Sequence, residues 1–150
     1  MTPLINVQPE DFDIAAEVAA LAKEASGDVG AIATFTGYVR ADDGLIALML
    51  EHYPAMTERE IARHVDKART KWPLLGATII HRVGRLVPGE RIVFVAVAAP
   101  HRGAAFEACE FLMDYLKIQA PFWKQEEYAS GTTWAEAKTR DDEAANRWRK

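Results

Sequence analysis

The chain has 150 residues, of which 49% are hydrophobic and 27% are charged, and its formal net charge is −4. This balance is typical of a globular protein and excludes disorder as the main state, so residues 1–150 are expected to form a single domain with its own core. The acidic surplus argues against nucleic acid as a partner. The longest apolar stretch, Ile92–Pro100, falls far short of the roughly 20 residues that a membrane-spanning helix needs, so no membrane partner is expected.

The sequence holds one cysteine, Cys109. A single thiol excludes an internal disulfide and a cysteine-rich zinc site, and it fits a reducing environment. Residues 1–6 show no basic region followed by an apolar run, so no signal peptide is expected. These observations together predict a cytoplasmic protein.

The first two predicted elements are a short strand over Leu4–Val7 and a helix that Pro9-Glu10-Asp11 opens. Acids in the first turn interact favourably with the helix dipole, and Gly27 is expected to end the helix. The predicted buried face of this helix consists of Ile14, Val18, Leu21 and Ala25.

A hairpin is predicted next, because Val29–Arg40 is rich in β-favouring residues, Asp42-Asp43-Gly44 is a turn signal and Leu45–Tyr53 provides a returning strand. The helix that follows begins with the pattern of a capping box. In that motif the Thr57 hydroxyl accepts from the Glu60 backbone N–H, and the Glu60 side chain reaches back. The face that this helix is expected to bury consists of Ile61, Val65 and Ala68.

Two further strands, Ala77–Leu86 and Arg91–Ala98, flank Pro88-Gly89 and are predicted to form a second hairpin. A third helix is predicted from Pro100 to about Gln119. Its apolar stripe consists of Phe106, Cys109, Leu112, Met113 and Leu116.

Pro121 breaks the third helix, after which Phe122–Tyr128 is expected to be extended. Ser130-Gly131 predicts a turn, and Thr132–Trp134 is expected to pair back. The tail from about residue 140 is charged. Hairpins beside about three helices favour an α+β domain over a doubly wound parallel sheet.

Several standard catalytic motifs are absent, among them the Gly-x-Ser-x-Gly elbow, the Gly-x-x-x-x-Gly-Lys phosphate loop and the His-Glu-x-x-His zinc motif. Chemistry is therefore expected from basic residues at the ends of elements. Pro100-His101-Arg102-Gly103 joins an apolar strand to a helix N-terminus, where free backbone N–H groups favour a phosphate or carboxylate. The alternative interpretation is an ordinary helix start with Arg102 in solvent.

Lys117 and Lys124 flank the break at Pro121. If they converge on one pocket they can act as acid, base or nucleophile, because a desolvated lysine beside another cation has a depressed pKa. A lysine at a helix C-terminus is also favourable for dipole reasons alone. Lys124 has aromatic and acidic neighbours that equally fit an exposed strand, so both interpretations stay open.

Arg40 ends the segment Thr36-Gly37-Tyr38-Val39-Arg40, in which Gly37 indicates a bulge or a close backbone approach. A charged strand end explains Arg40 equally well. Cys109 lies on an apolar stripe and is interpreted as a buried, inert thiol. No metal site is predicted, because the remaining histidines lack ligand spacing and are interpreted as structural or surface residues. These histidines are His52, His64 and His81.

Five segments stand in a familiar order and spacing: Phe35-Thr36-Gly37-Tyr38-Val39-Arg40, Leu50-Glu51-His52-Tyr53-Pro54-Ala55-Met56-Thr57, Ile80-His81-Arg82-Val83-Gly84, Ala99-Pro100-His101-Arg102, and Met113-Asp114-Tyr115-Leu116-Lys117 with Ala120-Pro121-Phe122-Trp123-Lys124. Through these segments the chain resembles the family of large, catalytic subunits of molybdopterin synthase. The resemblance covers roughly residues 3 to 140, and the last segment is its most specific part.

The resemblance implies a sulfurtransferase of molybdenum cofactor biosynthesis. It implies conversion of cyclic pyranopterin monophosphate (precursor Z) into molybdopterin by insertion of two dithiolene sulfurs, with no resident cofactor. The sulfurs come from the thiocarboxylate at the Gly-Gly C-terminus of a small ubiquitin-like sulfur-carrier subunit. The implied fold is an α/β-hammerhead with an antiparallel sheet. The implied assembly is a heterotetramer, a central dimer of large subunits with one small subunit at each end.

The resemblance also implies site residues. Lys117 meets the tail of the carrier and Lys124 lies beside it, and these two are expected to be catalytic through proton transfer and oxyanion stabilisation. The positions implied to bind substrate are Tyr38, Val39, Arg40, His101, Arg102, Lys117, Lys124, Gln125 and Glu126. Tyr38 and Gln125 stand where relatives often carry a basic residue.

Two other functions fit the same residues. One is a non-catalytic binding module of the same fold, which holds a phosphorylated ligand or a partner's tail and for which Lys117→Ala leaves function nearly intact. The other is a plain structural interaction domain, which has no affinity for the pterin precursor.

Overall fold

The computed structural model describes residues 1–134 and residue 148. Its strands and helices are β1 (Leu4–Gln8), α1 (Ile14–Ala25), β2 (Ala31–Tyr38), β3 (Ala47–His52), α2 (Met56–Lys71), β4 (Gly76–Arg82), β5 (Gly84–Leu86), β6 (Arg91–Ala99), α3 (Arg102–Ile118), β7 (Phe122–Tyr128) and β8 (Gly131–Trp134). Two short 3-10 turns are η1 (Ser26–Asp28) and η2 (Asp42–Gly44). Residue 148 apart, the charged tail from about residue 140 lies outside the described residues.

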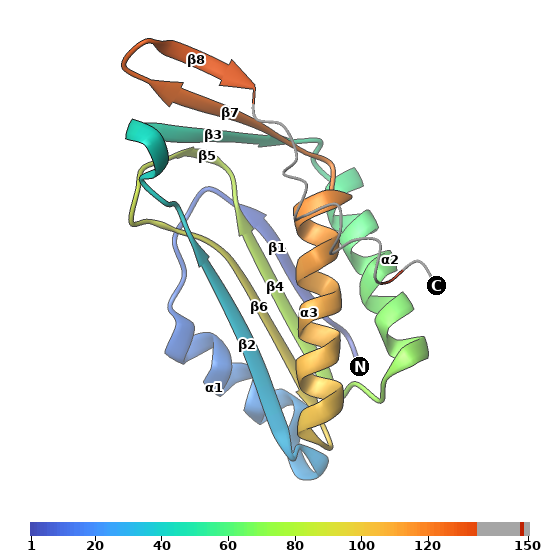
Figure 1. Ribbon diagram of the computed structural model, residues 1–150. Coiled ribbons are helices and arrows are strands. Elements are labelled where there is room, and N and C mark those ends of the chain that lie inside the picture. Colours follow the sequence, from blue (N-terminus) through green and yellow to red (C-terminus); the bar gives the residue numbers. More distant parts are fainter. Residues whose placement is uncertain (135–147, 149–150) are drawn as a thin grey trace.

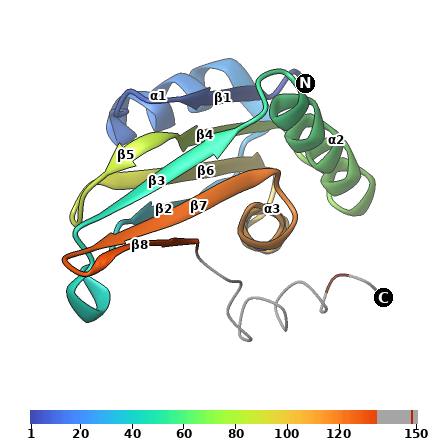
Figure 2. The same ribbon diagram turned by 90° about the horizontal axis from the view of Figure 1, so that it is seen from above.

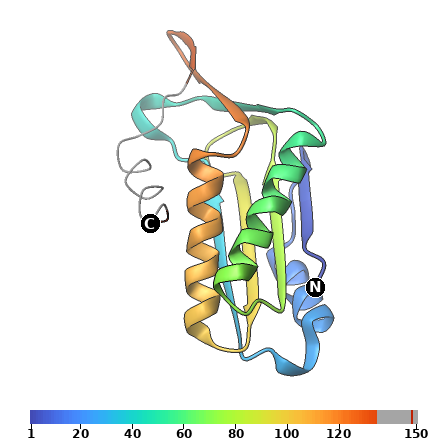
Figure 3. The same cartoon turned by 90° about the vertical axis from the view of Figure 1, so that its right-hand side faces the viewer.

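The first sheet has the strand order β1-β4-β6-β2. β2 and β4 both pair antiparallel with β6, whereas β1 pairs parallel with β4. Helices α2 and α3 lie side by side over one face of this sheet, and α1 covers the other (Figure 1, Figure 3). The first sheet is therefore the middle of three layers.

Strand β6 is buried on both faces, which explains its nearly continuous apolar sequence. Val93, Val95 and Val97 pack in the cluster beneath α2 and α3. Phe94 and Ala96 point the other way, into the cluster beneath α1. The predicted pairing of the strands on either side of Pro88-Gly89 is confirmed by the antiparallel register of β4 and β6.

The second sheet has the order β5-β3-β7-β8 and lies across one end of the first (Figure 1, Figure 2). All of its pairs are antiparallel, and the predicted return of the chain after Ser130-Gly131 is confirmed by β7 and β8. A third cluster packs in this region and consists of Val39, Leu48, Leu50 and Leu86. With three α-helices and two mostly antiparallel sheets among the described residues, the α+β prediction is confirmed.

The first predicted hairpin is wrong. Strand β2 pairs with β6, and the returning segment β3 pairs with β5 and β7 in the other sheet. The turn itself forms as η2, in which Asp43 has φ 49° and Gly44 has φ 80°. The turn redirects the chain from one sheet to the other instead of folding it back, because β3 buries Leu48 and Leu50 against Leu86.

Two other expectations on strands and helices need correction. The strand expected over Ala77–Leu86 is divided between the two sheets as β4 and β5, at a corner where Gly84 has φ 90°. Helix α1 begins at Ile14, later than expected, because the Asp13 Oδ1 atom accepts from the Ala16 N–H at 3.0 Å.

The capping box at Thr57 is also wrong. Thr57 lies inside α2, and its hydroxyl donates to the Tyr53 carbonyl at 2.9 Å. The Glu60 carboxylate instead accepts from Arg63 one turn later, at 2.9 Å. On α3, Phe106 does not belong to the buried stripe, since 66% of its surface is exposed.

Candidate functional site

The expected site residues lie at the two ends of α3 and on the strands beside them. With 17 residues, α3 is roughly 25 Å long. Pro100 and His101 lie at its start, and Lys117 lies in its last turn. Strand β2 runs in the same direction as α3, because both are antiparallel to β6, so Tyr38 lies at the Lys117 end (Figure 1).

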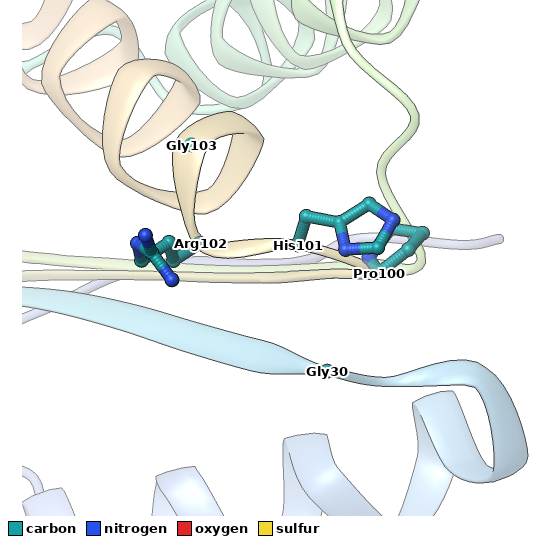
Figure 4. Close-up of a pocket in the computed structure, with 5 residues that line it drawn as sticks. All are labelled: Gly30, Pro100, His101, Arg102 and Gly103. Atoms are coloured by element: carbon teal, nitrogen blue, oxygen red, sulfur yellow. The ribbon is translucent and has the colours of Figure 1, made fainter.

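A pocket of about 570 Å³ opens at the start of α3, lined by Gly30, Pro100, His101, Arg102 and Gly103 (Figure 4). His101 is the N-cap in extended backbone geometry, with φ −136°, and its side chain does not cap the helix. No acidic side chain lies in the first turn. Free backbone N–H groups, the helix dipole and two exposed basic side chains therefore favour an anion here.

Gly30 makes this pocket possible, and the sequence did not single it out. A Cβ at Gly30 would lie 1.9 Å from the Pro100 carbonyl oxygen. The Gly30 N–H also donates to the Ala99 carbonyl at 3.0 Å. Only glycine allows β2 to approach the β6–α3 connection this closely.

Lys117 and Lys124 both lie near the other end of α3. Lys117 is exposed, whereas Lys124 is half-buried on β7 opposite Leu50 of β3. Both lysines act electrostatically on the same buried side chain, His81 of β4. Their convergence on one pocket remains a prediction.

Two histidines complete this end of the site. Burial lowers the pKa of His81 to about 4, with a smaller contribution from the positive charges of Lys117 and Lys124. The His81 ring stacks on Phe122 with 4.0 Å between ring centroids. His52 lies 6.3 Å from the same ring, and its buried Nδ1 atom has no hydrogen-bond partner among the described residues.

The end of β2 supplies a second charged group. Arg40 is exposed, and its guanidinium donates to Asp42 Oδ2 from Nε at 2.8 Å. Tyr38 is 56% exposed, whereas the side chain of Val39 is buried in the core. The irregularity expected at Gly37 is confirmed, because the register with β6 shifts there and an added Cβ would lie 2.8 Å from Val93 Cγ1.

The remaining two positions lie on opposite faces of β7, because neighbouring residues of a strand alternate. Glu126 shares the face of Lys124, and its carboxylate accepts from the Tyr128 hydroxyl. That hydrogen bond raises the pKa of Tyr128. Gln125 faces the other way, opposite Met49.

The five basic residues therefore do not converge within one chain. His101 and Lys117 are separated by nearly the whole of α3, roughly 24 Å along the helix axis. The chain presents two half-sites: an anion pocket at the start of α3, and a lysine pair with Arg40 at its far end.

Comparison with known proteins identifies the family of this chain. A family model described as "MoaE protein" matches residues 7–119. A molybdopterin synthase catalytic subunit from Mesorhizobium japonicum is 52% identical over 152 aligned residues, which cover 99% of this chain and 95% of that relative.

Similarity to solved structures supports the same family assignment. A molybdopterin biosynthesis MoaE protein from Burkholderia ambifaria has a TM-score of 0.84 at 47% identity, with 98% of both chains covered. A complex of subunits 1 and 2 of molybdopterin-converting factor from Helicobacter pylori has the same fold, with a TM-score of 0.73 at 22% identity and 91% of both chains covered. The chain belongs to the MoaE family, whose members include the catalytic subunits of molybdopterin synthase.

Proposed function

We propose that this protein is the catalytic subunit of a molybdopterin synthase, a sulfurtransferase that acts in the cytoplasm. It converts cyclic pyranopterin monophosphate into molybdopterin by inserting two dithiolene sulfurs. A small ubiquitin-like carrier with a Gly-Gly C-terminus delivers each sulfur as a thiocarboxylate, and no resident cofactor takes part. Membership of the MoaE family supports this proposal, and the H. pylori complex of two subunits supports a small partner.

The observation that carries the proposal is that Lys117, in the last turn of α3, and Lys124, on the strand β7 that follows, both act electrostatically on the same buried side chain, His81. When a thiocarboxylate sulfur attacks a carbon of the pterin side chain, the new carbon–sulfur bond replaces a carbon–oxygen bond, whose oxygen leaves on the phosphate or as water. Carrier and substrate then become joined as a thioester. Water then cleaves the acyl–sulfur bond through a tetrahedral oxyanion, which releases the carrier as a carboxylate. One ammonium stabilises the oxyanion, and the other lysine transfers the proton.

The phosphate of the substrate belongs at the start of α3. His101, Arg102 and the free backbone N–H groups there offer charge-assisted hydrogen bonds to the singly charged cyclic phosphate. Because this pocket lies roughly 24 Å from Lys117 in one chain, we assign the two half-sites of one reaction centre to two copies of the protein.

A two-fold axis beside β2 would bring the half-sites together. Strand β2 is the last strand of its sheet, so one of its edges is unpaired within the described chain. If two β2 strands meet antiparallel, the Gly30 end of one copy lies beside the Tyr38 end of the other. The pocket of one copy then faces Arg40 and Lys117 of the other.

Exposed aromatic side chains flank this edge and support the dimer. Phe35 of β2 is 40% exposed, and Phe106 of α3 is 66% exposed. Phe106 lies about 140° around the helix from Phe111, which packs against Trp72 after α2. Phe106 therefore lies on the flank of α3 that faces away from α2, towards the β2 edge.

The other substrate-binding positions take supporting roles in this proposal. Tyr38 and Arg40 contact the substrate directly. Val39 holds them in place, because its N–H donates to the Glu90 carbonyl and its carbonyl accepts from Gly89. Glu126 contacts the substrate from the face of Lys124, whereas the Gln125 side chain lies on the opposite face of β7 and supports the strand.

Reconstitution with a thiocarboxylated carrier and precursor Z tests the function. Wild type is expected to form the dithiolene product, and Lys117→Ala is expected to lose at least about 100-fold in rate while still folding and binding the carrier. Lys23→Ala is the matched control, because Lys23 also lies in the last turn of a helix. Absence of product from wild type would overturn the proposal, and full activity of Lys117→Ala would favour the binding module.

A further inference from the structure

Arg40 is held by an acidic neighbour, Asp42, to which the proposed chemistry gives no task. The Arg40 Nε atom donates to Asp42 Oδ2 at 2.8 Å, and the Nη2 atom lies 2.6 Å from the same oxygen. Both distances are typical of charge-assisted hydrogen bonds. No other side chain among the described residues pairs with Arg40, so Asp42 alone sets the direction in which the guanidinium points.

The backbone on either side of this ion pair is fixed. Before Arg40, the Val39 N–H donates to the Glu90 carbonyl at 2.9 Å. After Arg40, the Asp42 carbonyl accepts from the Leu45 N–H at 2.9 Å and closes the η2 turn. Neither bond involves the Asp42 side chain, which can therefore orient the guanidinium without also supporting the turn.

The contact occupies one particular edge of the guanidinium. A guanidinium can bind an anion through the edge formed by Nε and Nη2 or through the edge formed by Nη1 and Nη2. Asp42 occupies the first edge, so within the described part of the chain the second edge is open to a ligand. Phosphate and carboxylate oxygens match that edge in a bidentate geometry. The ion pair therefore leaves Arg40 with one defined edge for an anion.

We propose that Asp42 is a positioning residue, which fixes Arg40 so that its Nη1–Nη2 edge meets the phosphate of the substrate. A side chain that is already held loses less conformational entropy on binding than one that moves freely in solvent. The two side chains are 66% and 47% exposed, so their ion pair contributes little to the stability of the fold. The consequence for substrate binding rests on the proposed function, whereas the ion pair itself does not.

The negative charge of Asp42 also repels an anion, and its neighbour Asp43 separates this effect from positioning. Asp43 lies in the same turn, and its side chain makes no hydrogen bond or ion pair to any described residue. Removal of either carboxylate weakens the repulsion, which salt screens, but only removal of Asp42 releases Arg40. Because asparagine tolerates the φ of 49° at Asp43, Asp43→Asn is a control that changes charge and keeps the turn.

Nitrogen-15 NMR of the arginine side chains tests the ion pair without any substrate. A guanidinium that rotates freely about its Nε–Cζ bond shows one averaged resonance for its terminal nitrogens, whereas a held guanidinium shows two. Wild type and Asp43→Asn are expected to show two resonances for Arg40, and Asp42→Ala is expected to show one. A single averaged resonance in wild type, or two resonances in Asp42→Ala, would overturn the proposal.

Kinetics in the reconstituted reaction test the positioning role. At an ionic strength of about 0.15 M, Asp42→Ala is expected to raise KM for precursor Z about 2- to 10-fold with kcat nearly unchanged. Asp42→Asn keeps an acceptor oxygen for the guanidinium and is expected to recover most of the affinity, while Asp43→Asn shows a KM no higher than wild type. A KM for Asp42→Ala at or below that of Asp43→Asn would contradict the proposal.

A double-mutant cycle determines whether Asp42 acts through Arg40. In protein that carries Arg40→Ala, the further substitution Asp42→Ala is expected to leave KM unchanged. An equal rise of KM with and without Arg40 would show that Asp42 acts independently and would contradict the positioning role. Should Asp42→Ala not fold, Asp42→Ser suits a turn and is expected to show the same rise in KM.

These measurements also separate this inference from the proposed function. If wild type forms no product while Asp42→Ala merges the two Arg40 resonances, the proposed function fails and the ion pair stands. If wild type is active while Asp42→Ala changes neither the resonances nor KM, the function stands and the inference fails.

Discussion

The environment of the Cys109 thiol keeps this sulfur out of the proposed transfer reaction. The Sγ atom is buried and lies 3.8 Å from the Val95 carbonyl oxygen. Burial raises the pKa of this thiol to about 11. Since the thiolate is the nucleophile, Cys109 is unreactive at neutral pH, as its place on the apolar stripe predicts.

Cys109→Ala is therefore expected to retain sulfur transfer at close to the wild-type rate. The same thiol is expected to resist alkylation by iodoacetamide at pH 8 in the native protein and to react once the chain is unfolded in guanidinium chloride. Mass spectrometry of the alkylated protein and the reconstituted assay measure the two effects. Loss of transfer in Cys109→Ala would mean that the thiol takes part in the reaction.

Single residues also mark the limit of prediction from sequence. Lys117 and Arg102 can be identified as candidates from the sequence, because each end of a helix favours one sign of charge and the position of each residue is predictable. His81 has no such local signal: its burial and its stack on Phe122 come from contact between β4 and β7, which are far apart in sequence. Val39 lies next to two exposed positions and is nevertheless buried, because it follows β2 and packs with Leu48, Leu50 and Leu86.

At the scale of elements, the half-site at the start of α3 depends on how closely β2 approaches the β6–α3 connection. Gly30→Ala places a methyl group 1.9 Å from the Pro100 carbonyl oxygen. We expect this substitution to lower the free energy of unfolding by at least about 2 kcal/mol and to weaken precursor binding. Thermal unfolding and calorimetric titration with precursor Z measure the two effects.

Gly103→Ala is the control for stability, because a Cβ at Gly103 meets nothing within 4 Å and Gly103 lies inside a helix. Its stability is expected to equal or exceed that of wild type. Equal stability of Gly30→Ala and Gly103→Ala would contradict the close approach of β2 to Pro100.

Most strands and helices follow from periodicity, but their partners do not. Asp42-Asp43-Gly44 is a genuine turn, and its two flanking segments are genuine strands. Local sequence indicates that the chain turns there and carries no information about which sheet it joins next. β3 pairs with β7 in place of the predicted pairing with β2. The register of the β3–β7 pair, with Leu50 opposite Lys124, is fixed only when the whole domain packs.

At the scale of the whole molecule, the β2 edge is the proposed interface between two copies. Phe35→Glu is expected to shift the protein from dimer to monomer in light scattering, because a charge at a two-fold axis repels its own copy. Leu4→Glu is the control, since Leu4 is also 40% exposed and lies on β1, at the opposite edge of the same sheet. If Leu4→Glu dissociates the dimer and Phe35→Glu does not, the interface lies at the other edge.

The central claim, a sulfur-transfer site shared between two copies, is tested most directly by mixing two inactive variants. Lys117→Ala and Arg102→Ala damage different half-sites, so a mixed dimer holds one site with both half-sites intact. After co-refolding in equal amounts, random pairing makes half of the dimers mixed, and the mixture is expected to form molybdopterin at about a quarter of the wild-type rate. A mixture no more active than the two variants measured separately would contradict the shared site.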